Sequence, residues 1–476
     1  MTKNEHDAFL AYKNKRRGLK DMNYYSLSLQ ELISLAYNND PEAQFWLGNI
    51  YYEGYGVDRD HREAHNWYLL AAEQGHSDAQ YQLGNLYLYG HGVAQDFKEA
   101  HKWWLLAAKQ GNAGAQSNLG YMYVKGDGVA QDYQKAFKWL ILSAEQGYAG
   151  AQYNLGRMYL QDNGVKQDYQ EAYKWFFLAA EQEHVQAQYN LGKMRLLGHG
   201  VEQNYLEARK WWLLAAEQGY ADAQVVLGLM YASGDFITQD YHEAYKWWSL
   251  AAKQRHPEAQ SGMGNLYYNG HGVEQDFKEA YKWYYLAAKQ GHTYAQFSLG
   301  NLYFHGDGVK QDYQEAHKWY LLAAEQGHTE AQFNLGVLYE KGYGVKQDYQ
   351  EARKWYLLAA EQGYEKAQYG LGNIYSLGNS VEQDFKEARK WYLLAAEQGF
   401  SSAHHNLGVL YYYGYGVKKD NEKAYFWILL AIANTSHNRY QDFVKLHDDV
   451  AAELNSKQRE KIKKQAREWM RDKGFE

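Results

Sequence analysis

The strongest constraint on this chain is a pair of residues that return at one fixed interval along most of its length. A glycine and a tryptophan each recur every 36 residues, so eleven copies of one unit follow each other without insertion or deletion. The glycines are Gly48, Gly84, Gly120, Gly156, Gly192, Gly228, Gly264, Gly300, Gly336, Gly372 and Gly408, and the tryptophans are Trp67, Trp103, Trp139, Trp175, Trp211, Trp247, Trp283, Trp319, Trp355, Trp391 and Trp427. Units of this size cannot bury an apolar face alone, so the interval predicts stacked copies that share a continuous core.

Each unit is predicted to form two helices joined by a turn. In the first unit Ala43, Leu47 and Ile50 share one helical face, and Gly54 supplies the left-handed residue that ends the helix near residue 53. The second helix follows the turn GYGVDRD. The copies together predict an all-α solenoid of eleven helix-turn-helix repeats.

The start and the packing of the second helix also follow from the sequence. Asp60 can accept hydrogen bonds from the first free amides, and Glu63 is predicted to reach back and complete a capping box. A glycine inside a helix costs about 1 kcal/mol relative to alanine. We therefore expect Gly48 to let the two helix backbones approach each other at Ala64, while Trp67 fills the gap to the next copy.

A stack needs covers for its two end faces, and the sequence supplies a candidate helix at each end. Ser28 and Glu31 form a possible capping box in the segment that precedes the first copy. The predicted order is a leader over 1–25 with partial disorder, an N-terminal capping helix over 26–40, the eleven repeats over 41–434 and C-terminal capping helices over 435–476.

Composition excludes several classes of partner and of chemistry. Lysine plus arginine number 50 against 57 acidic residues, a formal net charge of −7, so no general attraction to nucleic acid or to anionic membranes is expected. The chain has no cysteine, which rules out disulfides and thiolate metal sites. Its first residues lack the apolar core of a secretory signal, and no run approaches the length of a membrane-spanning helix. These features predict a cytoplasmic protein, with export by a signal-less route left open.

The unit AQxxLGxxYxxGxGVxQDYxEAxKWYLLAAEQGH resembles the Sel-one-like repeat, a relative of the tetratricopeptide repeat, over residues 41–434. The resemblance implies a right-handed superhelix of antiparallel helix pairs that acts as an adaptor between proteins. It also implies that the first helix of each unit lines a concave groove. A cysteine-rich secreted branch of the family binds penicillin-type compounds, and it is a poor match because this chain has no cysteine.

No constellation of catalytic residues is evident. His76, His184, His256, His292 and His328 share one position of the unit, so neighbouring histidines lie at least one helix-packing distance apart, roughly 8–10 Å, and cannot ligate one metal together. The turn sequences GYG, GHG and GDG lack the third glycine and the preceding strand of a dinucleotide site. We predict no enzymatic activity, no cofactor and no metal.

Asparagines are the most frequent candidates for contact with a partner in the groove that the resemblance implies. An asparagine offers both a donor and an acceptor and can bind the backbone of an extended peptide. The candidates are Asn49, Asn85, Asn118, Asn154, Asn190, Asn265, Asn301, Asn334, Asn373 and Asn406. The alternative, a solvated helix surface copied by recent duplication, stays open.

Copies three to five replace the expected residues with cations and one tyrosine: Tyr121, Lys125, Arg157, Lys193 and Arg195. Because charge-assisted hydrogen bonds are roughly twice as strong as neutral ones, this set predicts a clamp for a carboxylate-bearing peptide. The alternative is drift, with each basic residue paired to a neighbouring acid.

Two further features depart from the pattern. Aromatic residues at variable positions of the first helices are candidate interface anchors, some of which could instead pack between copies: Trp46, Tyr52, Tyr268, Phe304, Tyr412 and Tyr413. Four residues stand where glycine is usual, and they suggest a local change of superhelix geometry: Asp162, Glu183, Phe236 and Arg255.

The sequence therefore predicts a monomeric, non-enzymatic scaffold that binds a peptide or protein segment, acidic in one sector, in the groove of a helical-repeat superhelix. One alternative is a secreted host-interaction effector that uses the same groove. A hydrolase or a penicillin-binding relative is the other, and no constellation of residues supports it.

Overall fold

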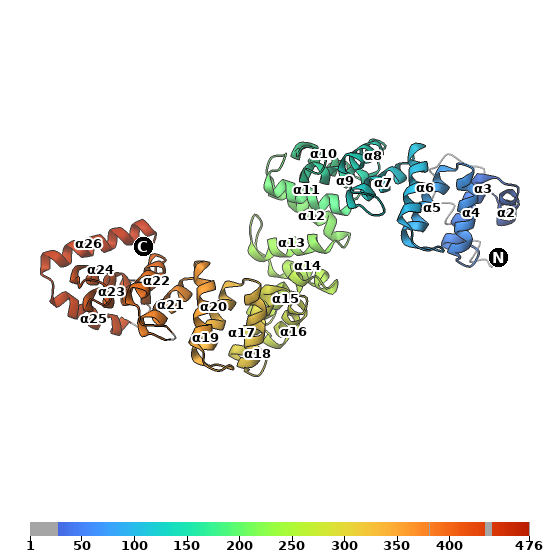
Figure 1. The fold of residues 1–476 in the computed structure, drawn as a ribbon. Coiled ribbons are helices and arrows are strands. Elements are labelled where there is room, and N and C mark those ends of the chain that lie inside the picture. Colours follow the sequence, from blue (N-terminus) through green and yellow to red (C-terminus); the bar gives the residue numbers. More distant parts are fainter. Residues whose placement is uncertain (1–26, 380, 434–439, 476) are drawn as a thin grey trace. The chain divides into compact units, whose positions relative to one another are not determined.

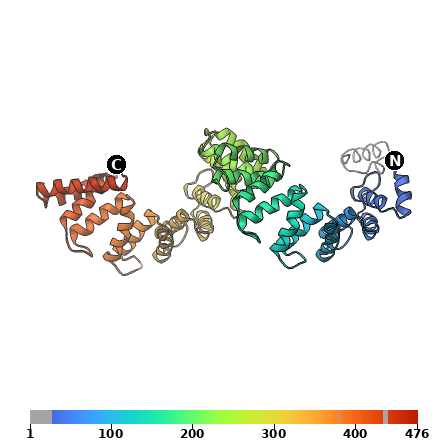
Figure 2. The same cartoon turned by 90° about the horizontal axis from the view of Figure 1, so that it is seen from above.

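The computed structural model describes residues 27–379, 381–433 and 440–475, and over these residues it contains 25 helices and no strand (Figure 1). This confirms the predicted all-α class. Figure 2 shows the helices from a second direction. The predicted leader over 1–25 lies outside the described residues.

Each repeat contributes an A helix followed by a B helix. The A helices are α3 (Pro41–Glu53), α5 (Ser77–Tyr89), α7 (Ala113–Lys125), α9 (Ala149–Gln161), α11 (Val185–Leu197), α13 (Ala221–Ser233), α15 (Pro257–Asn269), α17 (Thr293–His305), α19 (Thr329–Lys341), α21 (Glu365–Leu377) and α23 (Ser401–Tyr413). The B helices are α4 (His61–Glu73), α6 (Phe97–Lys109), α8 (Tyr133–Glu145), α10 (Tyr169–Ala180), α12 (Tyr205–Glu217), α14 (Tyr241–Lys253), α16 (Phe277–Ala288), α18 (Tyr313–Glu325), α20 (Tyr349–Glu361), α22 (Phe385–Glu397) and α24 (Asn421–Ala433). Outside the repeats lie α2 (Leu29–Tyr37), α25 (Tyr440–Ala452) and α26 (Ser456–Lys473).

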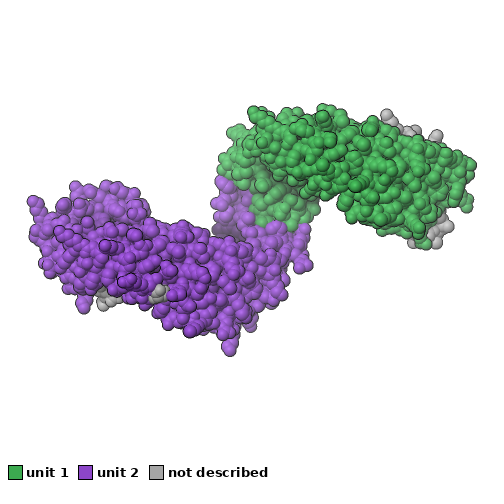
Figure 3. All heavy atoms as spheres, in the orientation of Figure 1, with its two compact units in different colours: residues 1–227 green, residues 228–476 purple. Residues whose placement is uncertain are grey.

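The chain divides into two compact units, which we call unit 1 (residues 1–227) and unit 2 (residues 228–476) and which Figure 3 draws in green and purple. The boundary falls inside α13, between Leu227 and Gly228. The unbroken period predicts one continuous object. A division without a linker is compatible with that period, because a repeat of a solenoid packs only on its neighbours. The two units are described separately below.

Aspartate caps the B helices, as the sequence predicts, but the glutamate does not complete a capping box. Asp60 accepts from the amides of Arg62 and Glu63 at 2.9 and 3.0 Å. The backbone amide of Asp60 already donates to the carbonyl of Tyr51 at 2.9 Å, so it has no proton left for the glutamate. The full capping box occurs instead before α2, where Ser28 and Glu31 bond reciprocally.

The glycine in each A helix lies against a side chain of the B helix. A Cβ added at Gly48 would lie 2.6 Å from the ring of Tyr68, and one added at Gly336 would lie 2.4 Å from the ring of Tyr356. Real Cβ atoms do not come this close to a ring. Where the facing side chain is aliphatic the backbones do approach as predicted, because a Cβ at Gly120 would lie 3.3 Å from the carbonyl oxygen of Ala136, the equivalent of Ala64. The expectation was therefore incomplete, because at Gly48 a ring fills the space.

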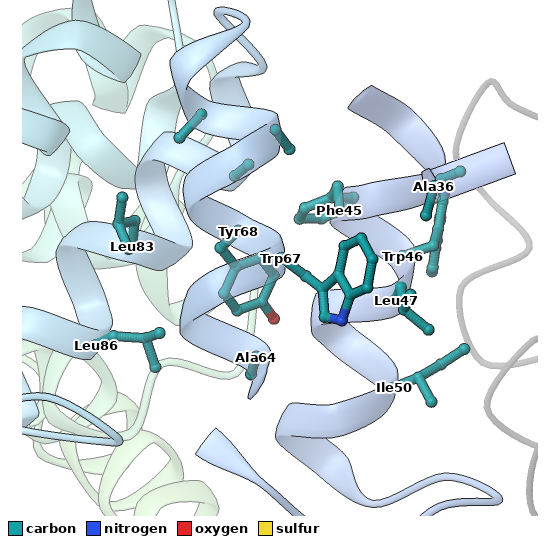
Figure 4. Close-up of a cluster of buried hydrophobic side chains, with 14 of the residues drawn as sticks. Ala36, Phe45, Trp46, Leu47, Ile50, Ala64, Trp67, Tyr68, Leu83 and Leu86 are labelled. Atoms are coloured by element: carbon teal, nitrogen blue, oxygen red, sulfur yellow. The ribbon is translucent and has the colours of Figure 1, made fainter. Parts of the chain in front are cut away.

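The core is a chain of aromatic and aliphatic side chains that passes from copy to copy. Figure 4 shows Trp67 and Tyr68 of α4 between Phe45 of α3 and Leu83 of α5, and all four belong to one buried cluster. Burying a large apolar side chain stabilises the fold by about 1.5–3 kcal/mol. Because the same positions recur in every copy, each interface repeats this contribution.

A ladder of buried glutamines joins neighbouring copies, and the sequence analysis missed it. Gln80 is 4% exposed, and its Nε2 donates to the carbonyl of Ala72 in the last turn of α4 at 3.0 Å. Its Oε1 accepts from Nε2 of Gln110, at the end of the next B helix, at 2.8 Å. The carbonyl of Ala72 also accepts from the amide of Gly75 at 3.0 Å, so the glutamine supplies a second hydrogen bond to the end of the B helix. The glutamine of "AQ" therefore connects its own A helix to the B helix before it and to the B helix after it.

The four residues that replace glycine keep its left-handed backbone conformation. Asp162, Glu183, Phe236 and Arg255 have φ values of 59, 62, 64 and 66°, in the left-handed region that the replaced glycines also occupy. The change of superhelix geometry stays a prediction. The backbone of each residue holds a conformation that costs roughly 1–2 kcal/mol for a residue with a Cβ.

Candidate functional site

The residues that differ most between copies lie on one side of the A helices. Four positions of each A helix, spaced i, i+4, i+7 and i+11, share one helical face, and we call it the variable face. In unit 1 it comprises Gly114, Asn118, Tyr121 and Lys125 on α7, Gly150, Asn154, Arg157 and Gln161 on α9, and Gln186, Asn190, Lys193 and Leu197 on α11. In unit 2 it comprises Glu258, Gly262, Asn265 and Asn269 on α15, Tyr294, Ser298, Asn301 and His305 on α17, and Glu330, Asn334, Val337 and Lys341 on α19.

The variable face of α7, α9 and α11 carries three cations and no carboxylate. Lys125 Nζ lies 5.8 Å from the ring centroid of Tyr121, and Lys193 Nζ lies 5.9 Å from that of Tyr189. Arg157 Cζ lies 5.8 Å from the ring centroid of Tyr153. Each cation therefore lies against a tyrosine four residues earlier on its own helix, a contact worth about 0.5–1 kcal/mol at an exposed site.

These three cations form no salt bridge with any described residue. The lysines of the B helices behave differently, because Lys102, Lys174 and their equivalents pair with a glutamate three residues earlier, as in Lys102–Glu99 at 2.9 Å. The alternative that the cations of unit 1 are simply paired to neighbouring acids therefore has no support among the described side chains. The face keeps its positive charge available to a ligand.

Arg195, which was grouped with these cations, belongs to a different contact. It lies about 140° around α11 from Asn190, given 100° per helical residue. Its Nη2 donates to the hydroxyl of Tyr173 at 2.9 Å. In other copies the two residue types are exchanged, as in Arg353, whose Nη1 donates to the hydroxyl of Tyr375 at 3.3 Å. Arg195 thus forms part of the packing between copies and does not join the three cations.

Three predicted asparagines have a structural hydrogen bond in addition to any role in binding. The buried hydroxyls of Tyr284, Tyr320 and Tyr392 donate to Oδ1 of an asparagine on the preceding A helix. The acceptors are Asn265 at 2.6 Å, Asn301 at 2.7 Å and Asn373 at 2.8 Å. Burial raises the pKa of all three phenols, so they remain protonated donors.

Most of the other asparagines of the variable face bond to one another or to their own helix, and one bonds to a tyrosine of a B helix. Asn118 donates to Oδ1 of Asn85 at 3.2 Å, and Asn85 donates to Gln82. Asn190 donates to the carbonyl of Gln186 at 2.7 Å. In unit 2, Asn406 donates to Asn373 at 3.3 Å, Asn334 hydrogen bonds with the hydroxyl of Tyr320, and Asn154 in unit 1 is partly exposed.

Two predicted contact residues of the first copy are not accessible. Asn49 is 4% exposed and Trp46 is 8% exposed. Asn49 accepts from the hydroxyl of Tyr68 at 2.8 Å, and the indole of Trp46 donates to Glu42 at 2.7 Å within the first core cluster. The expectation that they face a partner is wrong here, because α3 is buried along most of its length.

Most of the aromatic candidates contact other aromatic rings of this chain. Tyr52 stacks on His61 at 4.8 Å, and its hydroxyl lies 3.2 Å from Nδ1 of His91 in the next copy. Tyr268 and Phe304 meet the first residue of their own B helices edge to face, each at 5.3 Å. Tyr412 and Tyr413 contact each other, with Tyr413 55% exposed.

A cavity of about 550 Å³ lies in unit 2 among α24, α25 and α26. Its lining contains both signs of charge, and these pair with each other, His447 with Asp448 at 2.9 Å and Lys463 with Glu460 at 2.8 Å. Over the described chain, no group of three His, Asp or Glu side chains is placed to hold a metal ion. None of the described helices combines the length and the apolar character needed to cross a bilayer.

Pairs of antiparallel helices that pack on their neighbours define the class of α-helical repeat proteins. The chain belongs to the Sel1 repeat family, and this confirms the resemblance drawn from the sequence. The family model matches residues 41–76, 77–112, 113–148, 149–184, 185–220, 221–256, 257–292, 293–328, 329–364, 365–400 and 401–436.

Two solved structures are similar over most of their own length. A protective antigen present in uropathogenic Escherichia coli strains, which displays the SLR fold, is 35% identical, with a TM-score of 0.85 and coverage of 94% of this chain and 95% of that one. A Sel1 repeat protein from Oxalobacter formigenes is also 35% identical, with a TM-score of 0.51 and coverage of 69% of this chain and 94% of that one. The search of curated proteins gave no match.

Proposed function

We propose that this chain is a monomeric, non-enzymatic interaction scaffold that binds an acidic peptide or protein segment on the variable face of α7, α9 and α11. The observation that carries the proposal is the cationic row of Lys125, Arg157 and Lys193, which has no carboxylate on its own face and no ion pair with any described residue. Carboxylates bind guanidinium and ammonium groups through charge-assisted hydrogen bonds. Partly exposed asparagine and tyrosine side chains beside the cations add uncharged donors and acceptors.

The test uses the full chain and a labelled peptide of alternating Glu and Ser. The peptide is about eight residues long, enough to span three A helices that lie 8–10 Å apart. The variant Arg157→Ala/Lys193→Ala is expected to bind it at least about tenfold more weakly, the loss of ~1.4 kcal/mol. The control variant Lys174→Ala/Lys210→Ala removes the same charge from the B helices of unit 1, where both lysines pair with glutamate. Equal affinity of the two variants contradicts the proposal.

One relative favours a second candidate function, a host-interaction protein that uses the same face. The similar structure of 35% identity is a protective antigen of uropathogenic Escherichia coli strains. Labelling of intact source cells with antibodies against this chain tests the idea. Signal on intact cells supports a host-facing location, and signal only after lysis supports the cytoplasmic scaffold.

A further inference from the structure

Unit 2 contains a small pocket on its variable face whose chemistry differs from that of the cationic row. The pocket has a volume of about 120 Å³ and is lined by Asn265, Tyr268, Tyr284, Tyr294, Ser298 and Asn301, among others. A water molecule occupies about 30 Å³ of liquid, so this space suits one small side chain. These lining residues come from α15, α16 and α17.

A short side chain lines the hollow. Ser298 stands at a position that five other copies fill with asparagine, namely Asn118, Asn154, Asn190, Asn334 and Asn406, while two others have glycine there, Gly262 and Gly370. The hydroxyl of Ser298 donates to the carbonyl of Tyr294 at 2.9 Å, so it lies back against its own helix. A serine here, in place of the longer asparagine, leaves space beside Tyr284.

The two asparagines of the pocket offer amide donors in a fixed orientation. Oδ1 of Asn265 accepts from Tyr284, and Oδ1 of Asn301 accepts from Tyr320. Because each phenol donates to the amide oxygen, each Nδ2 remains as the donor for a ligand. Within the described part of the chain, neither Nδ2 makes a hydrogen bond.

The walls of the pocket are aromatic and uncharged. Tyr268 stands on one side, and Tyr294, which is 44% exposed, stands on the other. Burial and the neighbouring Asp307 carboxylate raise the pKa of the Tyr268 phenol, so its ring stays neutral. The pocket therefore combines aromatic surface with hydrogen-bond donors.

We propose that this pocket binds a proline-rich segment in the polyproline II conformation. A proline residue has a carbonyl acceptor and an apolar ring but no amide proton, which matches a site with donors and aromatic walls. A polyproline II helix has no internal hydrogen bonds, so its carbonyls are free to accept. Asn265 and Asn301 line the same pocket, so one such segment can accept from both amides. This site is separate from the acidic-segment site of unit 1.

The experiment measures binding of two labelled, uncharged peptides to the full chain by fluorescence anisotropy. One is an oligoproline of about nine residues, three turns of polyproline II helix, and the other is a Gly/Ser peptide of the same length. The oligoproline is expected to bind at least about tenfold more tightly. Ser298→Asn fills the pocket with the residue of five other copies and is expected to abolish this preference while the helical circular dichroism stays unchanged.

Two further variants separate the pocket from general surface effects. Tyr268→Leu introduces the residue found at the same position in Leu88, Leu160 and Leu196, and it is expected to weaken oligoproline binding about tenfold. Tyr89→Leu removes an exposed tyrosine of unit 1 and is expected to leave binding unchanged. The proposal is overturned if the oligoproline binds no better than the Gly/Ser peptide or if Ser298→Asn binds it as before. The variant Arg157→Ala/Lys193→Ala is expected to lose binding of the acidic peptide and to keep binding of the oligoproline. That result tests the site of unit 1 separately from the pocket of unit 2.

Discussion

The variable faces of unit 1 and unit 2 use the same helix positions for different chemistry. On α7, α9 and α11 the face carries three cations and no carboxylate, whereas on α15, α17 and α19 it carries Glu258, Glu330 and Lys341 beside a neutral, hollowed sector. The supporting residues hardly change between the units: a glycine against a ring, a capping aspartate and a buried glutamine recur in both.

This difference shows that the packing residues and the variable side chains occupy separate positions of the repeat. The ring of Phe176 lies against Gly156 in unit 1, and the ring of Tyr320 lies against Gly300 in unit 2. None of these residues belongs to the variable face. Substitutions on the variable face therefore leave unchanged the glycine and the ring that pack the two helices. The face is not wholly outside the core, because Trp46, Asn49 and Ser298 on it are 8%, 4% and 7% exposed.

The largest expected effect tests whether the framework is equivalent in the two units. Phe176→Ala and Tyr320→Ala remove rings that are 0% and 1% exposed, and each is expected to lower the free energy of unfolding by about 3–5 kcal/mol. Thermal or urea denaturation followed by circular dichroism measures the loss. The controls Leu178→Ala and Leu322→Ala, 39% and 43% exposed, are expected to cost far less. A large effect in one unit alone would show that the frameworks differ.

The next largest expected effect is the salt dependence of peptide affinity, which should differ between the variable faces of the two units. Raising the salt concentration from about 0.1 to about 1 M shortens the Debye length from ~10 to ~3 Å. The affinity of unit 1 for the acidic peptide should then fall about tenfold, ~1.4 kcal/mol, because exposed charges are screened. The affinity of the oligoproline for unit 2 should change less than about twofold, since its site offers uncharged donors and rings. A common salt dependence, measured by anisotropy titration, would contradict the assignment of different chemistries.

Much of the framework could be predicted because its signals are periodic. The glycine, the tryptophan and the capping aspartate mark two helices per copy, and the structure has them there. The role of Gly48 was only partly predicted because a sequence does not show that the ring of Tyr68, twenty residues later, fills the space beside it. The glutamine ladder was missed because polar residues in a core are identified by their hydrogen bonds, which no spacing reveals.

The candidate site was predictable only in part, since helix position does not determine accessibility or pairing. Lys193 and Arg195 stand two residues apart, yet one lies on the variable face and the other is bonded to Tyr173. Asn49 and Asn265 occupy the same position of the repeat, but the first is buried and the second lines a pocket. The pocket is lined by Ser298, where five other copies have asparagine, and a hollow appears only when neighbouring helices are placed.

Histidine side chains cap helix starts in both units, at His76 and His184 in unit 1 and at His292 and His328 in unit 2, and each cap is expected to contribute about 1 kcal/mol. Nδ1 of His184 accepts from the amide of Ala187 at 3.4 Å, and Nδ1 of His328 accepts from Ala331 at 3.3 Å. Only the neutral ring can accept there. Burial lowers the pKa of both histidines, and for His328 the nearby Glu330 opposes the shift.

The sign of the pH effect follows from these lowered pKa values. The unfolded chain takes up a proton near the ordinary histidine pKa of about 6.5, whereas the folded chain resists it until a lower pH. Stability from the His184 and His328 caps is therefore complete above pH ~6.5 and is lost as the pH falls below that value. His184→Asn and His328→Asn follow the natural cap Asn112, which accepts from Ala115 at 2.9 Å. Hydrogen exchange at α11 and α19 should accelerate less in these variants between pH 7 and pH 5, and equal acceleration would contradict the cap mechanism.

The smallest expected effect concerns one turn in each unit where a side chain replaces glycine. Glu183 and Arg255 hold φ values of 62 and 66°, and a Cβ at the equivalent Gly75 and Gly291 would meet no atom within 4 Å, so the strain lies in the backbone alone. A glycine at these positions removes the left-handed strain, which stabilises the folded state by roughly 1–2 kcal/mol. The greater freedom of glycine in the unfolded chain costs about 0.4–1 kcal/mol in return. Glu183→Gly and Arg255→Gly should therefore each stabilise the fold by about 0.5 kcal/mol, measured as a small rise in the denaturation midpoint. Glu181→Gly and Lys289→Gly, where φ is −62° at both positions, should instead lower it, because only the entropic cost remains.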